Sequence, residues 1–301
     1  MKKFEIINKL IRHPKFFLLI GDKLNLYRLS DERYLKLMYE YKLSRKLNLD
    51  NPTTFNEKIQ WLKLHDRKDI YTIMVDKYLA KDYVANLIGS NYIIPTLGIY
   101  EKFDDIDFEK LPDQFVIKCT HDSGGLVIVK NKKCINKNNV KKKIERCMKH
   151  NYYYSGREWP YKNVKPKIII EKYMEDKKTS ELRDYKFFCF KGVPKFMFLA
   201  TDRQINDTKF NFYDLDFNLL PFTQGHPNDT RIIEKPQNFD KMIELAKVLS
   251  KDIPHVRVDF YEINGNIYFG ELTFYHYSGF TKFNPNEWDE KLGKYIEISN
   301  I

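Results

Sequence analysis

Residues 255–273 constrain the fold of this chain most strongly, because they have the pattern of a β-hairpin. From Val256 to Tyr261 apolar and polar residues alternate strictly, which is typical of a half-buried strand. The second arm, residues 267–274, is rich in β-branched and aromatic residues. Between the arms lies the pair Asn264-Gly265, which is typical of tight hairpin turns. The sequence therefore predicts two paired antiparallel strands here.

The loop length of this hairpin decides which side chains share a face. A two-residue loop, Asn264-Gly265, would place Asp259 and Glu271 on opposite faces, whereas a three-residue loop through Asn266 would place them directly opposite each other. Like charges in that position are destabilising unless a cation lies between them. Two carboxylates suit Mg²⁺, which fills its remaining positions with phosphate oxygens and water. The hairpin alone thus allows either a Mg²⁺ site or an ordinary turn with an exposed charge pair.

Composition and net charge narrow the class of protein and of partner. The chain has 301 residues, of which 43% are hydrophobic and 31% charged, as in soluble globular proteins. Its net charge of +11 favours anionic partners such as nucleotides, acidic polysaccharide, nucleic acid or an anionic membrane surface. The basic segment 130–149 carries no recognised nucleic-acid motif, so we expect a solvated helix there and no nucleic-acid partner.

Targeting and redox signals favour a cytoplasmic protein. The apolar run at residues 16–20 is far too short to span a bilayer, and no small-residue cleavage site follows it. The four cysteines lack metal-binding spacing, so we expect reduced thiols. Basic residues beside the apolar run allow at most a peripheral contact with the inner face of a membrane, and a helix packed on the body is the alternative.

Short strands alternate with helical segments and form several hairpin-like pairs, which predicts an α+β fold. We divide the chain into a helical N-terminal region (1–75), a first α+β lobe (76–170) and a second lobe with the hairpin (171–301). Asp31 is expected to cap one N-terminal helix, and a capping box from Thr54 to Glu57 starts another. A strand is expected at residues 92–95.

A second hairpin, residues 115–129, carries a Gly-Gly turn and a lysine in an apolar strand. Such a loop brings backbone N–H groups close to a phosphate. A plain turn explains Gly124-Gly125 equally well, but it does not explain Lys118, whose buried ammonium group needs an anion.

Several ordered stretches of this sequence together resemble one superfamily. They are NPTTFNEKIQWLKLHDR, VDKY, FVIKCTHDSGG, GREWPYKN, IIIEKYMED, DYKFFCFKG, FYDLDFNLLPF and RVDFYEINGNIYFGELTF. From about Asn51 to the C-terminus the chain resembles the ATP-grasp superfamily, and most closely the TupA-like ATP-grasp family, which is linked to teichuronic acid and other cell-surface polysaccharide synthesis. The resemblance implies two α+β lobes that clamp ATP, preceded here by the helical N-terminal region.

The resemblance also implies an ATP and Mg²⁺ site made by both lobes. The residues that it assigns to the phosphates and the transition state are Lys77, Lys118 and Arg257. Those that it assigns to the phosphate loop, the adenine hinge and the ribose are His121, Ser123, Gly124, Gly125, Glu171, Lys172, Tyr173, Met174 and Glu181, with Asp184 as a competing ribose ligand. Those that it assigns to the metal are Asp259, Glu271 and Thr273, and this grouping selects the three-residue loop. Many ATP-grasp ligases have Asn where this chain has Thr273, and a hydroxyl offers only one oxygen.

The resemblance implies an ADP-forming ligase that activates a carboxylate as an acylphosphate and joins it to an amine. The acceptor would be an acidic sugar, a glycan or an amino acid, contacted by residues such as Arg157, Trp159, Arg183, Arg203 and the loop 275–279. An ATP-dependent sugar kinase would use the same ATP residues. A glycosyltransferase is the other alternative, because Asp214-Leu215-Asp216 could hold a metal and a nucleotide sugar, although a structural turn is the favoured interpretation of that tripeptide.

Overall fold

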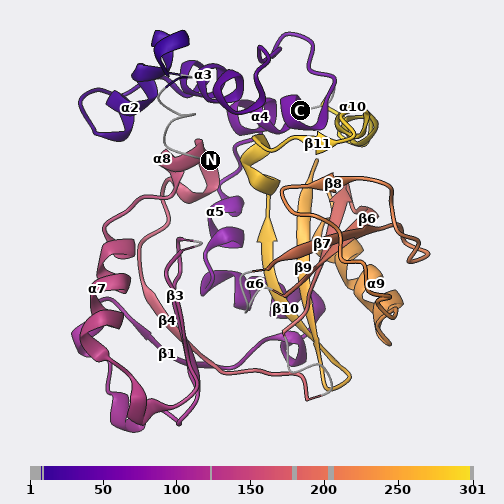
Figure 1. Cartoon of the computed structure of the whole chain (residues 1–301). Helices are drawn as coiled ribbons and strands as arrows, with labels where there is room; N and C mark the ends of the chain where they lie inside the picture. The colour runs from indigo at the N-terminus through magenta and orange to yellow at the C-terminus, as the bar shows by residue number, and fades with distance from the viewer. Residues whose placement is uncertain (1–7, 9, 123, 178–181, 203–206, 299–301) are drawn as a thin grey trace.

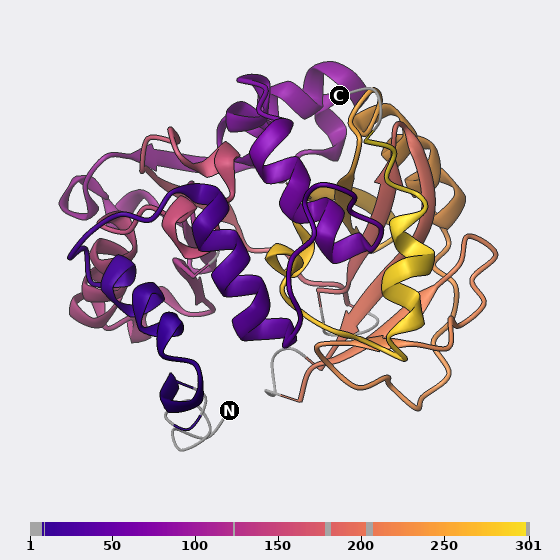
Figure 2. The same cartoon turned by 90° about the horizontal axis from the view of Figure 1, so that it is seen from above.

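Two antiparallel sheets face each other across a pair of helices, and further helices from the N-terminal part cover one end (Figure 1). This arrangement comes from a computed structural model, which describes residues 8, 10–122, 124–177, 182–202 and 207–298. The view from above shows the N-terminal helices reaching outward from the sheets (Figure 2).

The first sheet has four strands in the order β1-β4-β2-β3. Its strands are β1 (Thr96–Tyr100), β2 (Phe115–Cys119), β3 (Leu126–Val129) and β4 (Ile168–Lys172). Helix α7 (Lys137–Met148) packs on one face, where Val140 and Ile144 join Phe115 and Ile117 in a core of their own. The other face of this sheet is turned toward the second sheet (Figure 1).

The second sheet has five strands in the order β10-β9-β5-β6-β7. Its strands are β5 (Asp184–Phe190), β6 (Val193–Thr201), β7 (Lys209–Tyr213), β9 (Val256–Ile263) and β10 (Asn266–Thr273). A small pair joins β8 (Thr223–Gln224) to β11 (Phe283–Asn284). Aromatic residues dominate the core around this sheet, for example Phe188 stacked on Phe196 with ring centroids 4.3 Å apart.

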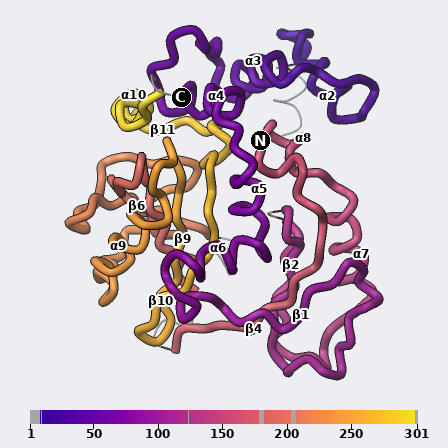
Figure 3. Tube along the Cα trace, turned by 180° about the vertical axis from the view of Figure 1, so that it is seen from behind, coloured from indigo at the N-terminus to yellow at the C-terminus, as the bar shows by residue number. Residues whose placement is uncertain are grey.

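Helices of the N-terminal part divide between two cores. Among the described residues, the helices before residue 90 include α2 (Phe17–Lys23), α3 (Asp31–Leu43), α4 (Phe55–His65), α5 (Ile70–Val75) and α6 (Leu79–Ile88). Helices α2 and α3 form a small core of their own, whereas α4, α5 and α6 share the core of the second sheet with α9 (Phe239–Leu249) and α10 (Glu287–Gly293). The predicted domain boundaries stay predictions. From behind, α5 and α6 lie between the two sheets (Figure 3).

Local signals explain most of these boundaries, with two corrections. The Thr54–Glu57 capping box is present, and Gly89 ends α6 with a φ of 111°. The cap of α3 is Ser30, whose side chain accepts a hydrogen bond from the backbone of Arg33, and not Asp31. The strand expected at 92–95 is also wrong: residues 90–92 form a 3₁₀ turn, and the strand begins after Pro95, which has no N–H to donate.

Candidate active site between the two sheets

A cavity of about 200 Å³ lies between the sheets and receives residues from both. Its walls come from β2 and β4 on one side, β5 and β10 on the other, and the junction of α5 and α6. The lining residues are Met74, Val75, Lys77, Ala80, Lys81, Ile93, Ile94, Lys118, Asp122, Gly125, Leu126, Glu171, Asp184, Lys186, Tyr261, Phe269, Gly270, Glu271 and Leu272. This volume is below the roughly 300–1,000 Å³ typical of ligand pockets, so a large ligand requires the walls to separate.

Lys118 finds its anion within the protein. The Glu171 carboxylate lies 2.5 Å from the Lys118 ammonium group and also pairs with Lys81, which donates a second hydrogen bond to the carbonyl of Ile94 at 2.6 Å. Strands β2 and β4 are paired neighbours, with Glu171 opposite Val116 and Lys118 opposite Ile169, so Lys118 and Glu171 are diagonal neighbours. Burial opposes ionisation of Glu171, but the two lysines outweigh it and hold the pKa of Glu171 below its ordinary value.

Lys77 joins the α5–α6 junction to the loop after β2. Its ammonium group donates to the carbonyl of Asp122 at 2.6 Å, and its backbone N–H donates to the carbonyl of Thr120 at 3.0 Å. Burial lowers the pKa of Lys77, and the charge of Glu271 partly restores it. Lys77 therefore bridges the phosphate loop predicted from sequence and the acidic end of the hairpin.

The loop His121–Gly125 reaches the cavity only in part. Asp122 and Gly125 line it, whereas His121 points toward α7 and contacts the carbonyl oxygens of Cys147 and His150 at 3.2 and 3.0 Å. The Gly124 N–H donates to the Asp122 carboxylate at 3.0 Å. Gly125 packs so tightly on Cys119 that an added Cβ would lie 2.5 Å from its sulfur. The predicted Ser123 lies outside the described residues.

The hairpin has the expected pairs of charged residues, but by a different route. The loop has two residues, Asn264 and Gly265, both at positive φ, and Asn266 pairs with Ile263. The predicted three-residue loop is therefore wrong. A β-bulge at Gly270 shifts the register by one residue, after which Glu271 pairs with Asp259 and Thr273 with Arg257. Because of the bulge, Asp259 and Glu271 lie on the same face, whereas a two-residue loop without a bulge would have placed them on opposite faces.

Arg257 organises the charges on that face. Its guanidinium group donates to both carboxylate oxygens of Asp259 at 2.7 Å, to Glu271 at 3.0 Å and to the Thr273 hydroxyl at 3.0 Å. Another nitrogen donates to Nδ1 of His276 at 2.8 Å. Burial lowers the pKa of His276, so this ring is neutral and able to accept.

Lys186, on β5, completes the cluster from the neighbouring strand. It pairs with Asp259 in the sheet register, and its ammonium group donates to the Asp259 carboxylate at 2.5 Å. Burial raises the pKa of Asp259, against the pull of Arg257 and Lys186. For Glu271 burial also opposes ionisation, but Lys186 and Arg257 outweigh it and bring its pKa to about 2. Glu271 is therefore ionised at neutral pH.

The oxygen donors suit a magnesium ion that takes most of its coordination shell from phosphate oxygens and water. Glu271 lines the cavity, whereas Asp259 lies behind it with both oxygens already bonded to Arg257 and Lys186. Thr273 donates its hydroxyl hydrogen to Glu271 at 3.2 Å. Within the described ranges no group of three or more His, Cys, Asp or Glu residues could hold a metal. One or two carboxylates with phosphate oxygens and water remain a suitable Mg²⁺ environment.

Only some of the residues predicted to contact the adenine and the ribose line the cavity. Asp184 lines the cavity, and its carboxylate lies 3.5 Å from the Lys186 ammonium group. Lys172, Tyr173 and Met174 follow Glu171 along the chain but are not among the described residues that line the cavity. Glu181 lies outside the described residues. Glu171, assigned to the adenine hinge, presents its carboxylate to Lys81 and Lys118.

Two lysines of the cavity, Lys81 and Lys186, were missed by the sequence reasoning. Lys81 lies on α6, four residues after Lys77 at the α5–α6 junction, and both line the cavity. Lys186 lies in a strand in which every residue is buried. A charge in such a strand is the same signal that identified Lys118, and it was available in the sequence.

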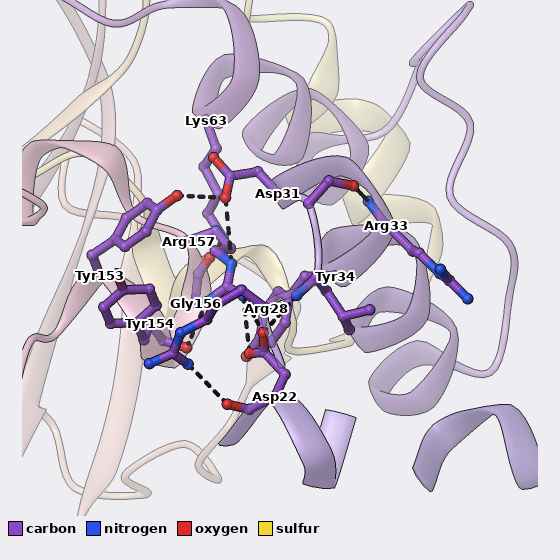
Figure 4. A network of polar contacts seen from close by, with 12 residues as sticks. Asp22, Arg28, Asp31, Arg33, Tyr34, Lys63, Tyr153, Tyr154, Gly156 and Arg157 are labelled. Carbon is purple, nitrogen blue, oxygen red and sulfur yellow. Dashed lines mark hydrogen bonds and ion pairs between the residues drawn. The ribbon is translucent and has the colours of Figure 1, made fainter. Parts of the chain in front are cut away.

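Arg157 was expected to contact an acceptor, and its surroundings argue against that role. Its side chain is only 1% exposed, and it donates to both oxygens of Asp22 at 2.8 and 2.9 Å (Figure 4). It therefore joins the N-terminal helices to the loop 151–161. Trp159 is half-buried, and Arg203 lies outside the described residues. In the loop 275–279, His276 contacts Arg257, as described above.

The Asp214-Leu215-Asp216 tripeptide forms a turn. The Asp214 carboxylate accepts hydrogen bonds from the backbone N–H groups of Asp216 at 3.0 Å and Asn218 at 2.8 Å. It accepts another from the Asn218 side chain at 3.0 Å. Its oxygens thus stabilise local structure, as the favoured interpretation predicted.

Comparisons with known proteins found several similar solved structures. Solved structures similar to the chain include D-alanine–D-alanine ligase from Helicobacter pylori (16% identity, 80% of this chain and 65% of that chain, TM-score 0.44). The same enzyme from Bacillus anthracis, complexed with ATP, is also similar (16%, 67% and 54%, 0.39), as is the ATP-grasp ligase PsnB with Mg and ADP (8%, 72% and 57%, 0.38). The chain spans less than two thirds of each of these structures. No curated protein matches it.

A family model gives the assignment. The model described as TupA-like ATP-grasp matches residues 57–297, which include both sheets and every residue of the cavity. This confirms the resemblance that the sequence motifs indicated, and with it the predicted α+β ATP-grasp fold. The chain belongs to the TupA-like ATP-grasp family.

Proposed function

We propose that the protein is an ADP-forming ligase that uses Mg·ATP to activate a carboxylate. One observation carries the proposal: Lys77, Lys81, Lys118 and Lys186 line one cavity together with Glu271. A triphosphate is the ligand whose charge such a set of cations neutralises. The family match supports ATP as that ligand.

In the proposed reaction a carboxylate of the substrate attacks the γ-phosphorus of ATP, giving an acylphosphate and releasing ADP. An amine of the second substrate then displaces phosphate. Lys77 and Lys118 would bind the phosphates as point charges, and Arg257 would stabilise the charge that develops on the transferring group. A Mg²⁺ ion held by Glu271 and Asp259 would screen the negative charge of the triphosphate.

The ion pairs already present suggest what the cavity residues do before ATP arrives. Glu171 holds the ammonium groups of Lys118 and Lys81 in place, and Asp259 holds Arg257 and Lys186. Cations fixed in this way need little reorganisation when a phosphate group enters. Because the cavity is small, we also propose that the two sheets separate to admit the nucleotide.

Nucleotide product analysis tests this proposal. The protein is incubated with Mg·ATP and a panel of uronic acids and amino acids, with and without hydroxylamine to trap an acylphosphate. We expect ADP, phosphate and a hydroxamate in the presence of the correct acid. Release of AMP would contradict the acylphosphate scheme, and a phosphorylated sugar as final product would identify a kinase instead.

The biological setting of the reaction is a proposal as well. We place it in the synthesis of a cell-surface polysaccharide such as a capsule or teichuronic acid, with an acidic sugar, glycan or amino acid as acceptor. The net charge of +11 suits an acidic acceptor. Among the described residues no helix is long and apolar enough to cross a membrane.

We further propose a cytoplasmic protein that contacts the inner face of the membrane through α2. Phe17 and Ile20 on α2 and Leu24 directly after it are 52%, 39% and 62% exposed. Lys15 and Lys23 are exposed beside them. Flotation with anionic phosphatidylglycerol vesicles tests the contact. The protein should float with these vesicles, and replacing the three apolar residues by Ser should abolish it; equal flotation of both proteins would contradict the contact.

A further inference from the structure

A second, larger cavity lies away from the site between the sheets. It has a volume of about 540 Å³ and is formed by the α2–α3 region on one side and residues 149–155 on the other. Most of its lining comes from residues before 57, outside the part of the chain that matches the family. Nothing in the proposed reaction uses this cavity so far.

The walls of this N-terminal cavity combine positive charge with aromatic rings. Four cationic residues line it, namely Lys23, Arg28, Lys42 and Lys149. The aromatic residues of the lining are Phe16, Tyr34, Tyr41 and Tyr154. Cations bind carboxylate or phosphate groups, while tyrosine presents both an apolar ring and a polar hydroxyl. Such walls suit a ligand that carries negatively charged groups and has both polar and apolar faces.

The one acidic residue among the described residues of the lining does not cancel this charge. Asp22 is buried, and both of its carboxylate oxygens accept hydrogen bonds from Arg157, as Figure 4 shows. Its carboxylate also accepts from the backbone N–H of Leu29 at 2.9 Å. Arg28 stacks on Tyr154, with its guanidinium carbon 4.1 Å from the ring centre. The electrostatic field of the wall is therefore positive.

A third hollow shares lining residues with this cavity and with the site between the sheets. It is lined by Asp122, Arg146, Cys147, Lys149 and His150 and has a volume of about 350 Å³. It shares Lys149 and His150 with the N-terminal cavity, and it shares Asp122 with the cavity between the sheets. Asp122 also accepts the hydrogen bond of Lys77 described above. The third hollow, which we call the connecting hollow, is therefore a neighbour of both cavities and reaches Asp122 at the proposed phosphate end of the site.

We propose that the N-terminal cavity binds an anionic saccharide, one that carries carboxylate or phosphate groups, and that the connecting hollow leads its reacting end toward Asp122. The inference rests on the proposed function only for the reaction at that end. The succession of hollows favours an extended ligand of several linked rings. Tyr41 and Tyr154, the two aromatic residues of the lining that are not buried, receive the rings, while Lys42 and Lys149 bind the negative groups.

Binding measurements without nucleotide test this proposal independently of the ATP reaction. The probes are trigalacturonate, whose rings each carry a carboxylate, and maltotriose, a neutral trisaccharide of equal length. The variants are the double substitution Lys42→Gln/Lys149→Gln and, as control, Lys247→Gln, an exposed lysine on α9. We expect trigalacturonate to bind at least about tenfold more tightly than maltotriose, and the double variant to lose about tenfold in affinity. The control should change by less than about twofold.

Three outcomes would overturn the proposal. Equal binding of the two trisaccharides would remove the role of charge. Full affinity in the double variant would place the ligand elsewhere. A single-stranded oligonucleotide that binds more tightly than trigalacturonate, and loses affinity in the same variant, would assign the cavity to nucleic acid. In every case the stabilisation by Mg·ATP should be unchanged in the double variant, so failure of the saccharide site and failure of the ATP site remain distinguishable.

Discussion

Glu171 is the residue on which the first half of the cavity depends. It is 5% exposed, and its carboxylate neutralises two lysines that come from different elements, Lys81 on α6 and Lys118 on β2. Without it, two ammonium groups would lie side by side in a partly buried place. Removing one partner of a buried ion pair costs much more than the pair itself contributes.

Glu171→Gln should therefore lower the free energy of unfolding at pH 7 by about 3 kcal/mol. The native pKa of Glu171 is lowered below its ordinary 4.5, so its contribution is fully present above that value and is lost as the pH falls through the native pKa. Urea unfolding at pH 7 and at pH 4 checks both statements. The difference between wild type and variant should shrink at pH 4, and a difference that grows there would contradict this sign.

Gly125 should tolerate no side chain, whereas Gly124 should tolerate a small one. A Cβ on Gly125 would lie 2.5 Å from the Cys119 sulfur and 2.8 Å from the Cys119 Cβ, which forces the loop away from the cavity. A Cβ on Gly124 would meet only the Asp122 carboxylate, at 3.5 Å. Titration calorimetry should show about tenfold weaker Mg·ATP binding for Gly125→Ala and less than about twofold for Gly124→Ala. Equal effects would remove this loop from the nucleotide site.

At the residue scale the sequence predicts which charges need a partner better than it predicts the partner. An ammonium group within an apolar strand, as at Lys118, signals a buried anion. That the anion is Glu171 depends on the pairing of β2 with β4, which are separated by α7 in the chain. Lys186, which the sequence reasoning missed, is a parallel case: its apolar strand carries the same signal, but its contact with Asp259 depends on the pairing of β5 with β9.

In the β9–β10 hairpin two glycines have different structural roles, Gly265 in the turn and Gly270 in the bulge. Gly265 closes the turn with a φ of 75°, in the left-handed region that other residues enter only at a cost. Gly270 forms the bulge that turns Glu271 toward Asp259. The predicted pairing of Asp259 with Glu271 is correct, but the predicted loop length is wrong, because a bulge far from the turn leaves little trace in a local pattern.

Substitutions at the two glycines should have different effects. Gly265→Ala should lower the free energy of unfolding by about 1 kcal/mol without altering Mg·ATP affinity, because a Cβ there meets nothing within 4 Å. At Gly270 a Cβ would lie 3.1 Å from the Asp259 carbonyl and 3.2 Å from the Tyr261 ring. Gly270→Val should therefore weaken Mg·ATP binding. Urea unfolding and calorimetry on both variants check this. Weakened nucleotide binding in Gly265→Ala would contradict the separate roles of the turn glycine and the bulge glycine.

At the scale of the whole molecule, the sequence predicted the kind of architecture and most of its elements. Helix starts and stops such as the Thr54 capping box and Gly89 are local events, and they were recognisable. The partition of the N-terminal helices was not, because α4 to α6 share the core of the second sheet while α2 and α3 do not. Long-range packing of this kind has no local signature. It places α5 and α6 between the sheets (Figure 1), and Lys77 and Lys81 line the cavity there.

The central claim is that the hairpin forms the magnesium end of an ATP site between the sheets. Glu271 tests it better than Asp259, because its side chain is 41% exposed and lines the cavity, whereas both oxygens of Asp259 are bonded within the protein. Glu290 on α10 is an exposed glutamate that serves as the control. A ligand that binds only the native state raises the melting temperature in proportion to its binding free energy.

The most direct measurement is a thermal-shift comparison of wild type, Glu271→Gln and Glu290→Gln with Mg·ATP, with ATP plus a chelator, and with a nucleotide sugar. We predict that Mg·ATP raises the melting temperature of wild type and Glu290→Gln equally, that Glu271→Gln loses most of this shift, and that chelator or nucleotide sugar gives little. A full Mg·ATP shift in Glu271→Gln, or a larger shift with the nucleotide sugar than with Mg·ATP, would contradict the account.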